Sequence, residues 1–460
     1  MISFDFLLEV LRPDQYRYAP LDFSAVTTDS RKMRPGSLFI ALRGPNFDGN
    51  AFAAIAMEAG ASAVLMDREG FQSHPVDGPF VAVPDTLLAL QSLAAAYRNR
   101  LKATVLGVTG SNGKTSAKEM LVGLLERRRV SCTQGNLNNH IGVPLTLLSL
   151  PADCEIAIVE MGMNHAGEIA LLSQLARPDH AIITSVGQAH MEFFDSVLSI
   201  ARAKLEITEG MKAGGVLLYH ADSPGLSLAR ETCQRKDIEL CPFGLGSGEG
   251  VRADFLGAGK QGISLAFENQ ELKNSHYFSR AMATNLFGTA MLALKSGCLP
   301  ATDLADAVRA ARPLSGGRFA VFQKDGKLLV DDTYNANPTS FSAALEDLRR
   351  LLPHGKLAVL AGEMAELGDS AAGAHREVGR RAAELGYSCL AYCGEIHGPL
   401  LAAEFRQVAP DAFTMAARNS EELARKVLPL LGEFDGILVK GSRSSRMERV
   451  SQVIKDQGYV

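Results

Sequence analysis

The sequence lacks several features that mark common classes of protein. Its seven cysteines are scattered and none form a CxxC pair, which disfavours a zinc site and fits reduced thiols buried as small apolar groups. It has no run of 18 uncharged apolar residues, so we expect no membrane span. The net charge of −4 disfavours a nucleic-acid-binding role, because such proteins carry a basic surface for the phosphates. We find no internal repeats and no low-complexity segments.

What is present indicates a folded, multidomain protein. Hydrophobic residues make up 47% of the 460, enough for real cores, and this length suggests about two to four domains. The first six residues contain Asp5 and no basic segment. We therefore expect no signal peptide and a soluble, cytoplasmic protein, which we take to be a monomer.

The order of predicted elements indicates an α/β protein with three domains. Residues 1–85 predict a small N-terminal α/β domain. Residues 86–100 predict an amphipathic helix that leads into the central domain, 86–314. Strands and helices then alternate, which predicts a mostly parallel sheet with helices on both faces and an antiparallel hairpin near 250–280. A stretch rich in glycine and proline, 312–318, marks the next boundary. Residues 315–460 predict a C-terminal Rossmann-like domain without the GxGxxG opening, so we expect no dinucleotide there.

The most informative stretch is 103–124, where a buried strand, a glycine turn and a helix follow one another. Backbone N–H groups in such a turn can surround phosphate oxygens, and the helix N-terminus adds partial positive charge. Lys114 would reach the β- and γ-phosphates and Thr115 a Mg²⁺ ion. The strict P-loop spacing requires glycine at position 108, which is Val108, and the first glycine is instead Gly110. The stretch therefore predicts a phosphate site but departs from the regular motif.

Three further residues could carry chemistry beside this loop. Glu160 follows a predicted strand and is either a Mg²⁺ ligand or a cap for the helix near Gly167. His190 follows the next strand, so it either faces the same crevice or has a structural role. Lys204 lies on a predicted helix with apolar neighbours. It is either a solvated lysine or a partly buried amine whose lowered pKa would allow reaction with CO₂.

Polar turns in the outer domains also have two interpretations each. Residues 29–31 and Arg43 would hold a phosphate or polar head group, or are ordinary turn residues. Residues 328–331 predict the first strand of the C-terminal domain, and residues 331–338 at its end form a cleft-facing loop, or a polar turn that caps the helix starting near Thr339. The loops 362–368 and 440–443 follow strands in the same way.

Taken together, these residues resemble the Mur ligase family, ATP-dependent enzymes that add amino acids to the peptidoglycan precursor. The resemblance covers essentially the whole chain, and it is specific because several short segments occur together and in order. These segments are 28–31 with 37–42, 135–144, 332–338 and 362–368. Family members carry the shortened Thr-Gly-x-x-Gly-Lys-Thr loop, so the departure from the strict P-loop becomes support for the resemblance.

The resemblance implies a role for each matching residue. The ATP site would comprise Gly110, Ser111, Asn112, Gly113, Lys114, Thr115, Asn285, Arg318 and Asp332. Two Mg²⁺ ions would be held by Thr115, Glu160, His190 and Lys204, the last as a carbamylated lysine, and Lys114, His190 and Lys204 would be catalytic. Substrates would contact Ser30, Arg31, Asn139, Tyr334, Asn335 and Asn337.

The resemblance also implies a reaction. The segments are most similar to the family member that joins D-alanyl-D-alanine to the terminal carboxylate of UDP-MurNAc-tripeptide through an acyl phosphate. The N-terminal domain would bind the UDP-sugar, and the C-terminal domain would bind the dipeptide and part of the ATP. One alternative is a folylpolyglutamate synthase-like ligase, which should lack the domain containing 28–42. Others are a P-loop ATPase that turns over ATP without a peptide product and a non-enzymatic nucleotide-binding module.

Overall fold

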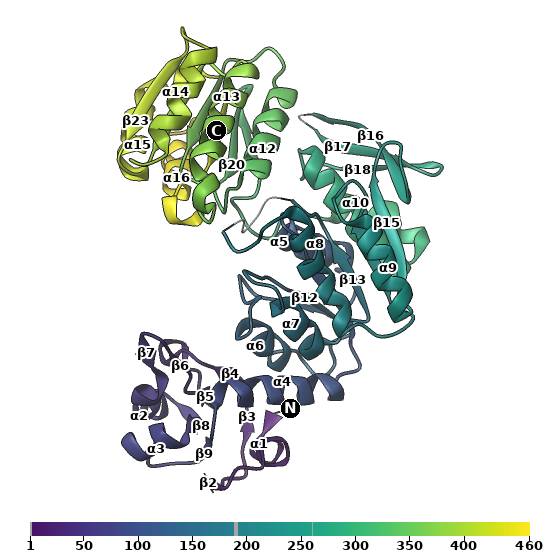
Figure 1. The fold of residues 1–460 in the computed structure, drawn as a ribbon, viewed down its shortest axis with the longest axis vertical. Coiled ribbons are helices and arrows are strands. Elements are labelled where there is room, and N and C mark those ends of the chain that lie inside the picture. Colours follow the sequence, from purple (N-terminus) through teal and green to yellow (C-terminus); the bar gives the residue numbers. More distant parts are fainter. Residues whose placement is uncertain (1, 188–191, 260) are drawn as a thin grey trace.

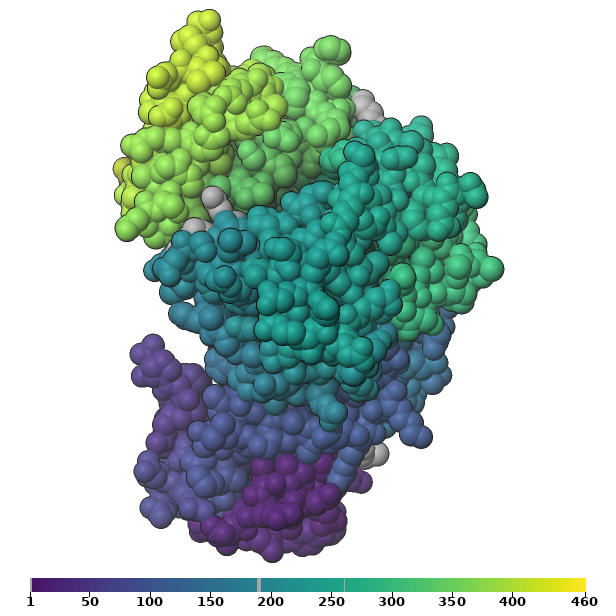
Figure 2. All heavy atoms as spheres, turned by 45° about the vertical axis from the view of Figure 1, so that its right-hand side comes forward, coloured from purple at the N-terminus to yellow at the C-terminus, as the bar shows by residue number. Residues whose placement is uncertain are grey.

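The computed structural model describes residues 2–187, 192–259 and 261–460. Three α/β regions follow one another along the long axis, each with its own principal sheet (Figure 1). The first part of the chain lies at one end, the middle part in the centre and the last part at the other end, and Figure 2 shows the same order on the surface. The predicted α/β fold class is confirmed. The domain limits at 85/86 and 314/315 stay predictions.

The N-terminal region contains a five-stranded sheet in the order β2-β9-β8-β5-β4, parallel except for β2. Its strands are β2 (Gln15–Arg17), β4 (Ala25–Thr27), β5 (Ser37–Ile40), β8 (Ala61–Asp67) and β9 (Phe80–Val83). The pairs β1 (Ile2–Ser3) with β3 (Asp22–Phe23) and β6 (Arg43–Gly44) with β7 (Phe47–Asp48) lie beside it. Its helices are α1 (Phe4–Leu11), η1 (Ser30–Lys32), η2 (Gly49–Phe52), α2 (Ala53–Glu58) and α3 (Arg68–Ser73).

Helix α4 (Thr86–Arg100) connects the N-terminal and central regions and has the predicted bounds. The Asp85 carboxylate accepts hydrogen bonds from two N–H groups of its first turn, which explains why the helix starts there. Its apolar residues belong to one hydrophobic cluster that extends from α1 into the central sheet. Tyr97 donates a hydrogen bond to the carbonyl of Leu150 at 2.8 Å. The first two regions are therefore joined by a continuous core.

The central region is built on a nine-stranded sheet in the order β11-β12-β10-β13-β14-β15-β16-β17-β18. The strands are β10 (Thr104–Thr109), β11 (Val130–Cys132), β12 (Ile156–Glu160), β13 (His180–Ile183), β14 (Val216–His220), β15 (Glu239–Leu245), β16 (Val251–Gly259), β17 (Gly262–Phe267) and β18 (Gln270–Asn274). Strands β10 to β16 and β11 are parallel, and β16, β17 and β18 form the predicted antiparallel edge. The near-continuous burial of β10 and β12 fits strands covered on both faces.

Helices cover both faces of this sheet, as the alternation predicts (Figure 1). They are α5 (Lys114–Leu124), α6 (Gly142–Leu148), α7 (Glu168–Ala176), α8 (Val197–Leu205), η3 (Glu206–Glu209), α9 (Leu226–Lys236), α10 (Arg280–Lys295), η4 (Ala301–Asp303) and α11 (Leu304–Ala310). Two hydrophobic clusters, one on each face, contain alternate residues of β10: Val105 belongs to one, and Leu106 and Val108 to the other. The sheet thus holds the loop after β10 in a rigid frame.

The C-terminal region has a six-stranded sheet in the order β19-β20-β24-β21-β22-β23, parallel except for β19. The strands are β19 (Ala320–Lys324), β20 (Lys327–Asp332), β21 (Leu357–Ala361), β22 (Cys389–Cys393), β23 (Phe413–Ala417) and β24 (Gly436–Lys440). The helices are α12 (Pro338–Leu351), η5 (Gly368–Ser370), α13 (Ala371–Glu384), α14 (Gly398–Val408), α15 (Ser420–Val427), η6 (Leu428–Glu433), η7 (Arg443–Ser445) and α16 (Glu448–Asp456).

The structure corrects the prediction that β20 is the first strand of this region, because β19 precedes it and pairs with it as a hairpin. Strand β19 is mostly exposed and lies at the sheet edge. Within the part of the chain that the structure describes, no helix has the length and apolar character needed to cross a membrane.

Candidate active site

The glycine loop between β10 and α5 depends on two glycines. Gly110 and Gly113 have φ values of 154° and 83°, in the region that favours glycine. A Cβ at Gly110 would lie 2.0 Å from the hydroxyl oxygen of Thr184, and one at Gly113 would lie 2.5 Å from Nδ2 of Asn285. Both positions therefore require glycine for its backbone conformation and for space.

Neighbouring residues hold this loop in place. The amide N–H of Ser111 donates to the carbonyl of Ser185 at 2.8 Å, and that of Asn112 donates to the Ser185 hydroxyl at 3.0 Å. Nδ2 of Asn337, from the C-terminal region, donates to Oδ1 of Asn112 at 2.6 Å. Gly113, the N-cap of α5, supplies no side-chain cap for this helix. The helix N-terminus is therefore suited to bind an anion such as a phosphate.

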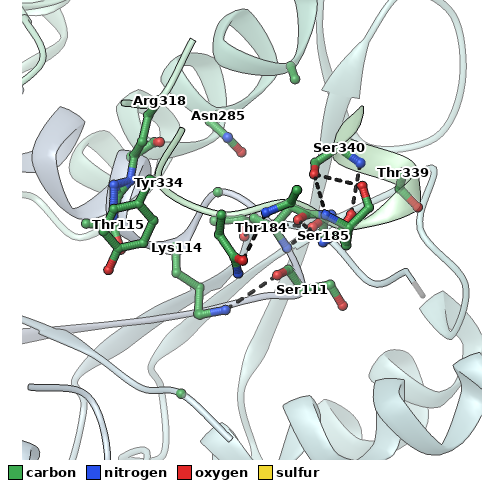
Figure 3. Close-up of a pocket in the computed structure, with 18 of the residues that line it drawn as sticks. Ser111, Lys114, Thr115, Thr184, Ser185, Asn285, Arg318, Tyr334, Thr339 and Ser340 are labelled. Carbon is green, nitrogen blue, oxygen red and sulfur yellow. Dashed lines mark hydrogen bonds between the residues drawn. The ribbon is translucent and has the colours of Figure 1, made fainter. Parts of the chain in front are cut away.

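Lys114 is the first residue of α5, and its ammonium group turns back to the loop. Nζ donates to the carbonyl of Gly110 at 2.7 Å (Figure 3 shows this side chain beside the loop). Burial lowers the pKa of Lys114, whereas the negative charges of Glu160 and Glu366 raise it and the positive charge of Arg318 lowers it. A cation at this helix N-terminus, between charged groups of two domains, fits a phosphate ligand.

Glu160 is the last residue of β12 and is 1% exposed. Its Oε1 accepts hydrogen bonds from the hydroxyl of Thr115 at 3.1 Å and from Nδ2 of Asn138 at 2.8 Å. Its Oε2 is buried without a hydrogen-bond partner and lies 3.5 Å from Nζ of Lys118. The alternative that Glu160 caps the helix near Gly167 is wrong, because Glu206 accepts the hydrogen bond from the Gly167 N–H.

This arrangement fits a Mg²⁺ ion. A buried carboxylate oxygen without a hydrogen bond and a nearby hydroxyl are oxygen ligands of the kind that Mg²⁺ takes, with water and phosphate oxygens completing the shell. Among the described residues there is no group of three or more His, Cys, Asp or Glu side chains that could hold a metal by themselves. His190, the other predicted ligand, lies outside the described residues.

Lys204, on α8, is 1% exposed. Burial, reinforced by the positive charge of Lys114, lowers its pKa well below the usual value for lysine. Over residues 2–187, 192–259 and 261–460, no hydrogen bond or ion pair to its amine is found. Of the two interpretations left open by the sequence, the structure thus selects the buried amine.

The C-terminal region contributes a cation and an ion pair to the same place. The Arg318 guanidinium stacks on the ring of Tyr334, with its carbon 3.6 Å from the ring centroid (Figure 3). Its Nη1 is buried without a hydrogen-bond partner. Asp332 accepts a hydrogen bond from the Phe319 N–H at 3.0 Å and forms an ion pair with Lys440 at 2.5 Å. Arg318 therefore keeps donors for a ligand, while Asp332 orders the chain beside it.

These groups share one cavity of about 890 Å³ between the central and C-terminal regions. The predicted residues that line it are Ser111, Asn112, Gly113, Lys114, Thr115, Asn139, Glu160, Asn285, Arg318, Asp332, Tyr334, Asn335 and Asn337. Gly110 and Lys204 lie outside its wall. Ser30 and Arg31 do not line the cavity, because they lie on η1 in the N-terminal region. On η1, Arg31 forms a bidentate ion pair with Asp29, at 2.8 and 3.0 Å.

Asn337 supports both interpretations of its loop. It caps α12 by accepting a hydrogen bond from the Ser340 N–H, and it also contacts Asn112 across the cavity.

The sequence analysis did not identify three residues of the site: Lys118 and Asn138 next to Glu160, and Lys440 next to Asp332. Lys118 could have been found from its position one turn after Lys114 on the same helix face. Lys440 follows the last parallel strand, where side chains meet at one sheet edge.

Comparison with known proteins agrees with this geometry. Three family models match: "Mur ligase family, catalytic domain" over residues 22–98, "Mur ligase middle domain" over 108–293 and "Mur ligase, glutamate ligase domain" over 317–443. The chain is 36% identical over 444 residues to the UDP-N-acetylmuramoyl-tripeptide–D-alanyl-D-alanine ligase of Bacillus subtilis, covering 96% of this chain and 94% of that protein.

Solved structures give the same result. A crystal structure of MurF from Acinetobacter baumannii superposes with a TM-score of 0.86 at 29% identity and covers 99% of both chains. The MurF ligase of Thermotoga maritima in complex with ADP has a TM-score of 0.79 at 29% identity, covering 94% of this chain and 97% of that one.

Proposed function

Because the chain belongs to the Mur ligase family, we propose that its cavity is the active site of an ATP-dependent ligase that joins D-alanyl-D-alanine to UDP-MurNAc-tripeptide. One structural observation supports this assignment most directly. The glycine loop, the buried Glu160 and the Arg318–Tyr334 stack, from two domains, line the same cavity. The named relatives, which cover nearly the whole chain, supply the substrates and the place of the reaction in peptidoglycan synthesis.

The reaction follows from the chemistry of the substrates. The terminal carboxylate of the tripeptide attacks the γ-phosphorus of ATP, giving an acyl phosphate and ADP. The amine of D-alanyl-D-alanine then attacks the acyl carbon and loses a proton, a peptide bond forms, and phosphate leaves. The main obstacle is the approach of an anionic carboxylate to an anionic phosphate. Lys114, the N-terminus of α5 and Arg318 would offset this repulsion.

Thr115 and Glu160 would hold Mg²⁺, which supplies charge compensation at the transferring phosphoryl group. The buried Oε2 of Glu160, which accepts no hydrogen bond, supports this role. Residue roles beyond these remain part of the proposal: a second Mg²⁺ ion near His190, adenine contact by Asn285, and substrate contacts by Ser30, Arg31, Asn139, Tyr334, Asn335 and Asn337.

We further propose that Lys204 is carbamylated. Burial lowers the pKa of Lys204 and so favours the neutral amine, which can add CO₂ and release one proton. The product would carry anionic oxygens, which a metal binds and an ammonium group does not. The burial of Lys204 and the absence of an acidic partner for it among the described residues support this proposal.

Phosphate release measured in four mixtures tests the function. The protein with ATP and Mg²⁺ is assayed alone, with UDP-MurNAc-tripeptide, with D-alanyl-D-alanine, and with both. We expect rapid release only with both substrates, together with a ligated product seen by mass spectrometry. Release with neither substrate would indicate a P-loop ATPase instead. The folylpolyglutamate synthase-like alternative is disfavoured by the N-terminal sheet, which contains residues 37–40 as β5 and matches a family model.

A further inference from the structure

The loop 362–368 lines the cavity through three consecutive residues, Ala365, Glu366 and Leu367. Glu366 has a φ of 62°, a left-handed conformation that costs a non-glycine residue about 1 kcal/mol or more. Its charge acts on Lys114, as the effect on the lysine pKa shows. The loop therefore has a conformation that other contacts must impose.

The loop is held on its N-terminal side by a series of hydrogen bonds. The Gly362 N–H donates to the carbonyl of Lys440 at 2.7 Å, and the carbonyl of Glu363 accepts from the N–H and the hydroxyl of Ser442 at 3.0 and 2.6 Å. The Met364 N–H then donates to Nε2 of His375 at 3.0 Å. This is the last of these hydrogen bonds before the three residues that line the cavity.

His375, on α13, is 1% exposed, and its two ring nitrogens have fixed roles. The carbonyl oxygen of Ala371, 2.7 Å from Nδ1, can only accept, so Nδ1 carries the proton. The Met364 N–H can only donate, so Nε2 is bare. Only one tautomer of the neutral ring satisfies both partners, and a protonated ring would lose the bond to Met364.

The titratable groups that face the ring are His397 and Glu363. His397, the N-cap of α14, stacks on His375 with ring centroids 4.7 Å apart and an angle of 15°. Glu363 accepts the N–H groups of Ile396 and His397 at 3.2 and 2.8 Å. Burial lowers the pKa of His375, although the hydrogen bond to Ala371 and the charge of Glu363 raise it. The ring is therefore neutral near pH 7.

We propose that His375 is a positioning residue for ligation: its neutral ring fixes the backbone at Met364, so that residues 365–367 face Lys114 across the cavity. This inference rests on the proposed function, because the amine of the dipeptide must reach the acyl phosphate formed near Lys114. A loose loop would leave the ATP contacts of the glycine loop intact but would weaken the orientation of the amine.

Two substitutions separate the two hydrogen bonds. His375→Gln places an amide oxygen near the position of Nε2 and can still accept from Met364. His375→Asn places its amide near the position of Nδ1 and can still donate to Ala371, but it leaves the Met364 N–H unpaired. The exposed His354 in the same domain offers the matched controls His354→Gln and His354→Asn.

We expect His375→Asn to raise KM for D-alanyl-D-alanine about five- to tenfold, in line with the cost of a buried unpaired N–H. KM for ATP should change less than twofold. His375→Gln should stay within about twofold of wild type for both substrates. Equal impairment of the two variants, or none in His375→Asn, overturns the proposal, because a packing role would not distinguish Asn from Gln.

Hydrogen exchange measured by mass spectrometry on a peptide containing Met364 tests the anchor without any substrate. Corrected for intrinsic rates, exchange in the loop should be faster in His375→Asn than in wild type and His375→Gln. In wild type it should accelerate at acidic pH, as the His375 ring becomes protonated. If His375→Asn does not fold, the pH dependence of exchange in wild type tests the proposal by itself. Protection at Met364 that does not change with pH would show that the His375 ring does not hold this backbone. If the wild-type protein shows this exchange pattern but does not ligate the two substrates, the proposed function is overturned and the anchor is not.

Discussion

Two short polar motifs of this chain, the glycine loop after β10 and the turn at 29–31, differ in how the structure treats them. Residues 111–115 of the glycine loop line the cavity together with Glu160. At the turn, the exposed Arg31 guanidinium is engaged by Asp29, which caps η1. We expect the first motif to bind its ligand through its own backbone, whereas the second would show a role beyond its turn only with a substrate bound.

The difference teaches which parts of a site a local pattern determines. A loop that requires glycine φ values and ends in a helix N-terminus creates its anion site from consecutive residues. An arginine side chain on a turn can pair within the turn or with a ligand, and both options look the same in the sequence. Four substitutions, from the largest expected effect to the smallest, test this contrast.

Lys114→Ala should have the largest effect, a loss of about 10³-fold or more in kcat. It removes a cation from a poorly solvated site where negative charge accumulates in the transition state. Steady-state phosphate release with both substrates measures it. Lys102→Ala, at an exposed lysine of the same domain, is the control and should keep wild-type rates. Comparable activity in the two variants would remove Lys114 from the reaction.

Lys204→Ala should lower kcat about 10²- to 10³-fold if the carbamate holds a metal ion. Acetate should restore part of the activity, because it can supply a carboxylate in the space left by the side chain. Arg202→Ala, at an exposed neighbour on the same helix, is the control. In wild type, ¹³C-labelled bicarbonate should give a carbamate carbon signal that Lys204→Ala lacks. Full activity of Lys204→Ala without acetate or bicarbonate would refute the carbamate.

How much the sequence could predict depends on the range of the interactions involved. The helix 86–100, the strand before Gly110 and the hairpin near 250–280 follow from local patterns, and the structure confirms them. The burial of Lys204 could not be predicted, because it depends on which helix face the rest of the domain covers. The edge strand β19 was missed because it also depends on a nonlocal contact: it is mostly exposed, and pairing with β20 holds it in place.

Gly113→Ala should raise KM for ATP about tenfold. The added Cβ would meet the Asn285 amide at 2.5 Å, in addition to the strain of a φ of 83°. Gly167→Ala is a matched control, since Gly167 is also a helix N-cap with a φ of 86° but has open space around its Cβ position. Titration calorimetry with ADP measures the affinity directly. An equal loss in both variants would assign the effect to backbone strain alone.

Arg31→Ala should have the smallest effect, a rise of about three- to tenfold in KM for UDP-MurNAc-tripeptide with kcat unchanged, because an exposed cation contributes mainly to binding. It should also raise the pKa of Asp29, which the hydrogen bond from Arg31 lowers to about 2, back toward 3.8. The sign follows because Arg31 stabilises the ionised carboxylate. NMR titration of the Asp29 carboxyl carbon checks this pKa, and Arg34→Ala, at an exposed arginine three residues after Arg31, should leave both quantities close to wild type. A raised pKa with an unchanged KM would assign Arg31 to the turn alone, and it would then share none of the ligand-binding character of the glycine loop.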